Sequence, residues 1–113
     1  MPGTPFSADH VEQDGDTVLS FHGDVTRDAE HALQAAYLAA KSGPGRLLLD
    51  FGDVDYINST GIALIVGLLA DSRSAQREVG AFGLSEHYRE IFTITRLADF
   101  MTIYQDAASA ARR

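Results

Sequence analysis

The sequence has no cysteine and no tryptophan, and only three of its 113 residues are proline. Without cysteine, disulfide bonds, thiolate metal ligands and thiolate nucleophiles are excluded. Basic residues are also few, because 9 lysines and arginines stand against 16 aspartates and glutamates, which gives a formal net charge of −7. An acidic surface repels phosphate backbones and anionic lipid, so the composition argues against nucleic acid or a membrane as a direct partner.

Long apolar runs are missing as well. The longest stretch, Ile62 to Ala70, contains Gly67 and falls far short of the roughly 20 residues that a membrane-spanning helix needs. Residues 1–5 contain proline and glycine but neither a basic start nor an apolar run. We therefore expect a flexible leader over residues 1–5, no secretory signal and a cytoplasmic protein.

Hydrophobic residues make up 45% of the chain, which is typical of a globular protein and predicts a single domain over residues 6–113. Apolar alternation and short apolar runs predict strands, whereas a period of about 3.6 residues predicts helices. The expected strands cover residues 6–12, 17–21, 46–51, 79–83 and 101–104. The expected helices begin after Thr26 and end before Ser42, run from Asn58 to about Ala75, run from Glu86 to about Arg96, and follow Asp106.

This order of elements predicts an α/β fold. Strands that alternate with helices need crossover connections, which make a sheet mainly parallel. The turn signal Asp14-Gly15-Asp16 adds an antiparallel hairpin at the start. We therefore expect a mixed, mainly parallel sheet of about five strands, with four helices predominantly on one face and an acidic loop over residues 52–57.

The most informative stretch runs from Leu47 to Leu69, where a buried strand leads to a helix that begins Asn58-Ser59-Thr60-Gly61. The first N–H groups of a helix lack intrahelical partners and, with the helix dipole, favour negative charge. A serine hydroxyl at this point is accessible to a partner and can carry a phosphate. The alternative interpretation is that Ser59 is a helix N-cap, a role that Asn58 fits equally well.

This stretch resembles the STAS domain family, which includes the anti-sigma factor antagonists of bacterial sporulation and stress signalling. The resemblance rests on an aliphatic strand that ends in Asp50, the bridge Val54-Asp55-Tyr56-Ile57, the run from Asn58 to Leu64, and the Gly23-Asp24-Val25 turn. The order of elements also agrees with the STAS fold from about Phe6 to Ala110. One position departs from the family pattern, since the family usually has aspartate where this sequence has Asn58.

The resemblance implies a phosphorylation-controlled partner switch that regulates transcription in a stress response. In the family, an anti-sigma factor that is also a serine kinase phosphorylates the serine two positions before the glycine, which is Ser59 here, with Thr60 as the alternative. The unphosphorylated domain binds the kinase and frees a sigma factor, whereas the phosphorylated domain lets go; a serine phosphatase is the second expected partner. The expected partner-binding residues are Asp24, Asn58, Ser59, Thr60, Gly61, Leu64 and Leu68.

The second helix supports a separate hypothesis about its two faces. At about 100° per residue, four aliphatic residues share one face that we expect to cover the sheet, namely Ile62, Ile65, Val66 and Leu69. Leu64 and Leu68 point the other way. They either pack against a neighbouring helix or form an apolar docking surface beside Ser59.

The sequence gives no support to an enzyme, a metal site or a cofactor. No histidine lies in a known metal-ligand spacing, and the chain has no phosphate-binding Gly-Lys-Ser/Thr loop. His22 and Asp24 are interpreted as a polar turn. Asp50 is expected to end a strand, while Asp53 and Asp55 are expected to be solvated.

Two questions stay open at the level of sequence. The alternative function is a non-switching STAS scaffold, a subunit of a stressosome-like signalling assembly or of a lipid-transport assembly. Such a subunit binds its partner stably and without phosphorylation. The sequence also leaves open whether the chain forms a homodimer and whether it binds a nucleotide.

Overall fold

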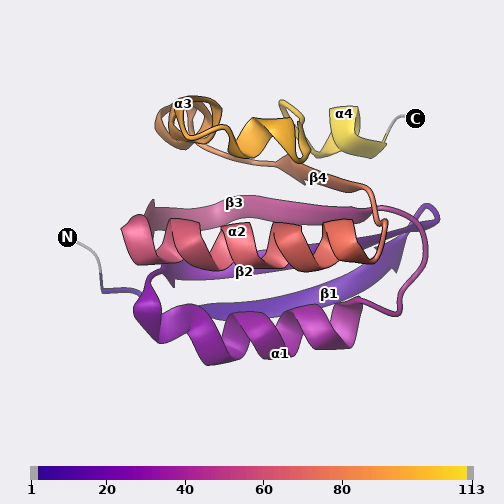
Figure 1. The fold of residues 1–113 in the computed structure, drawn as a ribbon, viewed down its shortest axis with the longest axis horizontal. Coiled ribbons are helices and arrows are strands. Elements are labelled where there is room, and N and C mark those ends of the chain that lie inside the picture. Colours follow the sequence, from indigo (N-terminus) through magenta and orange to yellow (C-terminus); the bar gives the residue numbers. More distant parts are fainter. Residues whose placement is uncertain (1–2, 112–113) are drawn as a thin grey trace.

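A computed structural model describes residues 3–111, and within them a five-stranded sheet has the order β1-β2-β3-β4-β5. Figure 1 shows β1 to β4 with the helices that pack on them. The strands are β1 (Ser7–Gln13), β2 (Asp16–Val25), β3 (Leu47–Ile57), β4 (Val79–Phe82) and β5 (Thr102–Ile103). The α-helices are α1 (Glu30–Ala40), α2 (Ser59–Ser74), α3 (Glu86–Ile94) and α4 (Ala107–Ala111). Two 3-10 turns, η1 (Arg27–Ala29) and η2 (Leu97–Asp99), complete the order.

The sheet is mixed and mainly parallel, as the sequence predicts. β1 and β2 form an antiparallel hairpin, and the remaining neighbours pair in parallel. Asp14 and Gly15, between the two hairpin strands, have φ values of 54° and 84°. Positive φ at both positions is typical of the tight turns that join antiparallel strands, which explains the Asp-Gly pair.

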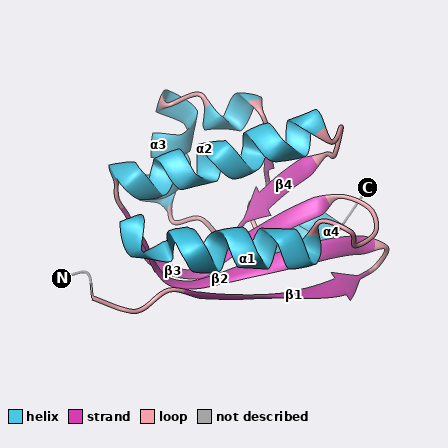
Figure 2. Ribbon diagram, turned by 60° about the horizontal axis from the view of Figure 1, so that its bottom comes forward, coloured by secondary structure: helices cyan, strands magenta, loops and turns pink. Residues whose placement is uncertain are grey.

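Alternation along the strands divides the apolar residues between two cores. The larger core gathers Leu19, Phe21, Leu49 and Phe51 from the sheet under side chains of α1, α2 and α3. The smaller core, on the other face, contains Val18, Leu48, Phe82 and Ala110, the last from α4. Figures 1 and 2 show α1 and α2 side by side along the sheet. The expectation that most helices cover one face is therefore confirmed.

The expectation of an acidic loop over residues 52–57 is wrong, because β3 continues to Ile57. These residues pair with β2, from His22 opposite Asp53 to Val25 opposite Ile57. The pairing register shifts twice, between Ser20 and His22 and again after Gly23. Such irregularities bend a strand and change which face its side chains occupy, so this segment extends the sheet to the start of α2.

Side chains cap the starts of α3 and α4. The side chain of Ser85 accepts a hydrogen bond from the Tyr88 N–H at 3.2 Å, and the carboxylate of Asp106 accepts one from the Ser109 N–H at 2.8 Å. The side chain of Thr26 makes no capping hydrogen bond, since the chain enters α1 through η1. No helix among residues 3–111 has the length and apolarity that crossing a membrane requires.

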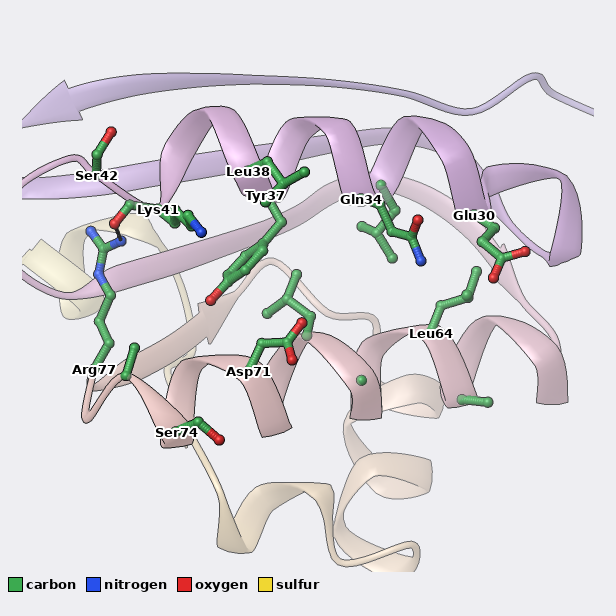
Figure 3. Close-up of a pocket in the computed structure, with 15 residues that line it drawn as sticks. Glu30, Gln34, Tyr37, Leu38, Lys41, Ser42, Leu64, Asp71, Ser74 and Arg77 are labelled. Atoms are coloured by element: carbon green, nitrogen blue, oxygen red, sulfur yellow. Dashed lines mark hydrogen bonds between the residues drawn. The ribbon is translucent and has the colours of Figure 1, made fainter.

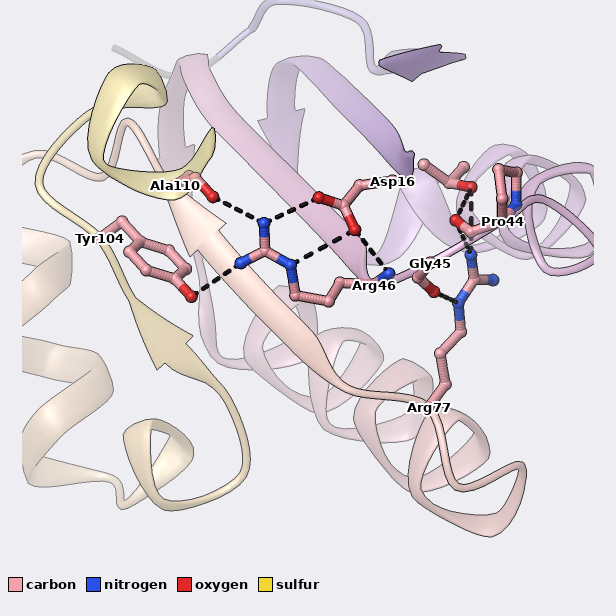
Figure 4. Close-up of polar contacts among 8 residues, drawn as sticks. Asp16, Pro44, Gly45, Arg46, Arg77, Tyr104 and Ala110 are labelled. Atoms are coloured by element: carbon pink, nitrogen blue, oxygen red, sulfur yellow. Dashed lines mark hydrogen bonds and ion pairs between the residues drawn. The ribbon is translucent and has the colours of Figure 1, made fainter. Parts of the chain in front are cut away.

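Two arginines fix the connection between α1 and β3 (Figure 4). The guanidinium of Arg46 pairs with the buried Asp16 carboxylate at 2.7 Å and donates to the Tyr104 hydroxyl and the Ala110 carbonyl at 2.9 and 2.8 Å. The guanidinium of Arg77 donates to five carbonyl oxygens that follow or end α1, those of Ala40, Lys41, Gly43, Pro44 and Gly45. Arg77 therefore caps the end of α1 from a distant part of the sequence.

Residues 3–5 lie against the end of β2. The N–H groups of Gly3 and Thr4 donate to the buried Asp24 carboxylate at 2.6 and 3.0 Å, and the Asp24 N–H donates to the Thr4 carbonyl at 3.1 Å. Gly23 has a φ of 87°, and a β-carbon there would overlap the Pro5 carbonyl oxygen. Within the leader expected over residues 1–5, residues 3 and 4 therefore make defined contacts with Asp24, and residues 1 and 2 lie outside the described part.

Candidate functional site

The start of α2 is built on Asn58. Its side-chain oxygen accepts a hydrogen bond from the Gly61 N–H at 2.9 Å, and its carbonyl accepts one from the Ile62 N–H at 2.9 Å. Its own N–H donates to the carbonyl of Val25 at 3.3 Å, which ties the helix start to the end of β2. Of the two capping residues that the sequence allowed, Asn58 is the N-cap and Ser59 is the first helical residue.

Because Asn58 serves as the cap, the Ser59 hydroxyl is left free. Ser59 and Thr60 are both exposed in the first turn of α2, and within residues 3–111 neither hydroxyl has a hydrogen-bond partner. The N–H groups of these two residues belong to the first helical turn, where no carbonyl of the helix itself is in reach. The helix therefore begins with two accessible hydroxyls beside N–H groups that favour a negative charge.

Gly61, which the sequence predicts as a partner-binding residue, has a packing role in the fold. It is buried, and a β-carbon at this position would overlap the carbonyl oxygen of Val25 and lie 2.7 Å from its carbonyl carbon. Only glycine lets the first turn of α2 approach the backbone of β2 this closely. Gly61 thus fixes how α2, and with it Ser59, sits on the sheet.

Tyr88 of α3 supports the same corner of the fold and was not identified from the sequence as a site residue. Its hydroxyl accepts a buried hydrogen bond of 2.8 Å from the N–H of Ile57, the last residue of β3. The sequence places Tyr88 only on the apolar side of a helix. A buried tyrosine hydroxyl needs a hydrogen-bond partner, so a tyrosine on the apolar side of a helix indicates a buried polar contact with another element.

His22 contacts acidic residues other than the one expected. Its Nδ1 lies 2.8 Å from Asp53 Oδ2, and its Nε2 lies 3.4 Å from Asp9 Oδ2. The hydrogen bond with Asp53 is the main cause that raises the pKa of His22 above its usual value, and burial opposes it. The expected polar turn of His22 with Asp24 is therefore wrong, since Asp24 accepts hydrogen bonds from residues 3 and 4. Asp24, which the sequence predicts as a partner-binding residue, thus serves as an internal hydrogen-bond acceptor.

The remaining acidic residues also differ in part from expectation. Asp50 lies within β3 instead of ending it, and its carboxylate accepts hydrogen bonds from the Ser20 hydroxyl and the Gly52 N–H at 3.3 and 2.8 Å. Asp53 and Asp55 are exposed, as expected, although Asp53 contacts His22. No group of three or more potential ligands suited to a metal occurs among the described residues.

Leu64 and Leu68 line a groove of about 950 Å³ between α1 and α2. Figure 3 shows Leu64 across this groove from Gln34 of α1. Leu68 is only 5% exposed and belongs to the main core, which Leu64 contacts as a partly buried residue. Leu68 is therefore a core residue and not part of an exposed docking surface. The alternative, that it packs inside the domain, agrees with its burial. Val66, which was expected to cover the sheet, is 46% exposed.

The family model described as Mlab, STAS domain matches residues 9–103, which is most of the chain. The chain belongs to the STAS domain family. Two anti-sigma-B factor antagonists, from Listeria monocytogenes and Listeria innocua, are each 39% identical to it over 57 residues. The aligned part spans about half the length of this chain and of those relatives. BtrV of Bordetella bronchiseptica is 31% identical over 104 residues, or 87% of each chain.

The fold of this STAS domain is also found in solved structures. The crystal structure of an anti-sigma factor antagonist from Mycobacterium paratuberculosis superposes with a TM-score of 0.80. The superposition covers 97% of this chain and 95% of that one, at 20% sequence identity. At this identity the similarity shows a shared fold. The sequence-based resemblance to STAS domains, and with it the fold class, is confirmed.

The seven site residues expected from the sequence fall into two groups in this STAS domain. Three lie at the accessible start of α2, namely Asn58, Ser59 and Thr60. The other four serve internal hydrogen bonds, backbone packing or the wall of the groove, namely Asp24, Gly61, Leu64 and Leu68. The accessible chemistry of the site is thus concentrated on two neighbouring hydroxyls.

Proposed function

We propose that this chain is an anti-sigma factor antagonist, a regulatory binding protein rather than an enzyme. Its membership of the STAS family and the names of its Listeria relatives support the proposal. The observation that carries it is the free, exposed hydroxyl of Ser59 at the start of α2. In this proposal an anti-sigma factor with serine kinase activity binds around that hydroxyl, and binding releases a sigma factor for transcription.

Phosphorylation of Ser59 is the step that ends the complex. The Ser59 hydroxyl oxygen forms a bond to the γ-phosphorus of ATP held by the kinase, ADP leaves, and the hydroxyl proton passes to a base of the kinase. The product carries a charge of about −1.5 to −2 where a neutral hydroxyl stood. A serine phosphatase restores the hydroxyl by hydrolysis and makes the chain competent to bind again.

The start of α2 accommodates this charge within the folded domain. Asn58 already occupies the Gly61 N–H, and the N–H groups of Ser59 and Thr60 are left to interact with a phosphate oxygen. The fold is therefore expected to survive the modification. A partner surface packed against the unmodified hydroxyl must instead bury a doubly charged group, and the cost of that desolvation weakens the complex.

The test combines phosphosite mapping with binding measurements on the unmodified full chain. Each anti-sigma factor kinase of the source organism is incubated with the chain and ATP, and the modified residue is identified by mass spectrometry. We expect phosphate on Ser59 and a fall in affinity of at least about tenfold by calorimetry, which corresponds to about 1.4 kcal/mol. Ser59→Ala is expected to bind the same kinase but not to be released by ATP.

Thr60→Ala is the matched control, because it removes the neighbouring exposed hydroxyl and leaves Ser59 in place. This variant is expected to be phosphorylated and released like the unmodified chain. Phosphate found only on Thr60 would contradict the assignment of the switch to Ser59. Equal affinity of the kinase for the phosphorylated and unphosphorylated chain would contradict the switch itself and favour a non-switching scaffold.

A further inference from the structure

β1 is a long edge strand without proline, lysine or a bulge. The sheet ends at one edge in β5, which has two residues, and at the other in β1, which has seven. Figure 2 shows β1 as the outermost strand on its side of the sheet. The outer side of an edge strand presents N–H and C=O groups that can pair with another chain. Proteins commonly block such edges with charged side chains, above all lysine, with proline or with a bulge, and β1 carries two acidic residues, Asp9 and Glu12. β1 contains neither proline nor lysine, and its register with β2 is continuous.

The side chains of β1 are complementary to a second, antiparallel copy of the same strand. Val11 is 54% exposed, and a two-fold axis through it places it opposite Val11 of the second copy. Since antiparallel pairs are symmetric about that axis, His10 then lies opposite Glu12 of the second copy, and this pair occurs twice. Within residues 3–111, neither His10 nor Glu12 has a hydrogen-bond or ion-pair partner.

We propose that two copies of this chain associate through β1, which joins their two sheets into one continuous sheet. The contact consists of main-chain hydrogen bonds between the paired edges, the two facing valines, and the two His10–Glu12 pairs. A register centred on His10 is less favourable, because it sets the two imidazoles side by side and places Asp9 opposite Val11. The proposal does not depend on the function of Ser59, which lies on α2.

The absence of cysteine allows a direct test of this register. In the Val11→Cys variant, the two thiols of a dimer face each other across the axis. Directly opposed strand residues have β-carbons about 4.5–5.5 Å apart, close to the roughly 3.5–4.5 Å that a disulfide requires. Under air oxidation we expect a disulfide-linked dimer. Val66→Cys is the matched control, because Val66 is 46% exposed on α2, away from β1. Equal rates of cross-linking in the two variants would overturn the proposal.

Sedimentation equilibrium tests association without a cross-link. The unmodified chain is expected to show a monomer–dimer equilibrium with a dissociation constant below about 1 mM. His10→Glu sets like charges opposite each other twice and is expected to weaken the dimer about tenfold. The double variant His10→Glu, Glu12→His restores the opposite pairs and is expected to recover dimerisation, while His87→Glu on α3 makes the same charge change elsewhere without effect. A chain that stays monomeric, a His10→Glu variant that associates normally, or a double variant that does not recover would each overturn the proposal.

Discussion

Replacement of Gly61 by alanine tests the contact that positions the start of α2. The added β-carbon would overlap the Val25 carbonyl oxygen and lie 2.7 Å from the carbonyl carbon and 3.1 Å from Ile57 Cγ2. Two of these three atoms belong to the backbone of β2, which cannot turn aside as a flexible side chain can. The first turn of α2 must therefore move away from the sheet, or the end of β2 must shift.

The expected loss of stability follows from two opposing terms. Extra atoms forced into a packed interior typically cost about 1–3 kcal/mol, and backbone contacts favour the upper part of that range. Alanine offsets up to about 1 kcal/mol, because it is a better helix former than glycine. We therefore expect Gly61→Ala to lower the free energy of unfolding by about 2 kcal/mol.

Gly67, two turns further along the same helix, provides the matched control. A β-carbon there would have no other atom within 4 Å, so Gly67→Ala carries the helix gain without the clash. We expect it to stabilise the chain by about 0.5–1 kcal/mol. Urea unfolding followed by circular dichroism measures both variants, and the midpoint of Gly61→Ala should fall by about 1 M. If Gly61→Ala stabilised the chain as Gly67→Ala does, the close approach of α2 to β2 would be refuted.

Two further predictions concern residues near the ends of β2 and β3, the two strands that lead to the start of α2. Tyr88→Phe leaves the buried Ile57 N–H without its acceptor and should lower the free energy of unfolding by about 1–3 kcal/mol; a loss too small to detect in urea unfolding would show that another group accepts this hydrogen bond. Because Asp53 raises the pKa of His22, the ion pair stabilises the fold fully below about pH 6.5 and loses its effect as the pH rises through the raised pKa. Asp53→Asn should lower the His22 pKa in an NMR titration while Asp55→Asn leaves it unchanged, and an unchanged pKa in the first variant would contradict the pairing.

The order of strands and helices could be predicted from the sequence because each element carries its own periodic signal. The buried runs at β3 and β4, the Asp-Gly turn and the caps at Ser85 and Asp106 are all local features. The length of β3 was underestimated for a physical reason. Asp53 and Asp55 suggested a loop, but each lies on an exposed side of a strand whose apolar residues alternate with them.

The buried face of α2 is rotated about the helix axis relative to the predicted one. A hydrophobic pattern gives no weight to glycine, although Gly61 lies on the buried face. The buried stripe is Gly61, Ile65, Leu68, Leu69 and Ser72. The pattern of aliphatic residues alone predicts a buried stripe that includes Val66 and leaves Leu68 on the outer side, the reverse of what the structure shows. The closest approach between α2 and the sheet occurs at Gly61, so the smallest residue decides which leucine is buried.

The same limit applies to the accessible site. The sequence showed that Asn58 or Ser59 would cap α2, but the choice depends on the backbone conformation of Asn58, which is extended and directs its side chain to the Gly61 N–H. The role of Asp24 depended on a contact with residues 3 and 4, about twenty positions away in the chain. The contact of Asp24 with residues 3 and 4 joins distant parts of the chain, so the residues around Asp24 give no indication of it.

The contacts of Arg46 determine how much of the chain must be synthesised before the sheet can reach its final packing. Its guanidinium joins the start of β2, through Asp16, with Tyr104 and with Ala110 in α4. These groups leave the ribosome at very different times, since the last of them is 64 residues beyond Arg46. Until the chain has been extended past Ala110, Arg46 and Asp16 lack the helix that covers them, so their ion pair is more exposed to water and weaker. The final packing of the sheet is therefore expected to be a late, cooperative event that depends on the emergence of α4.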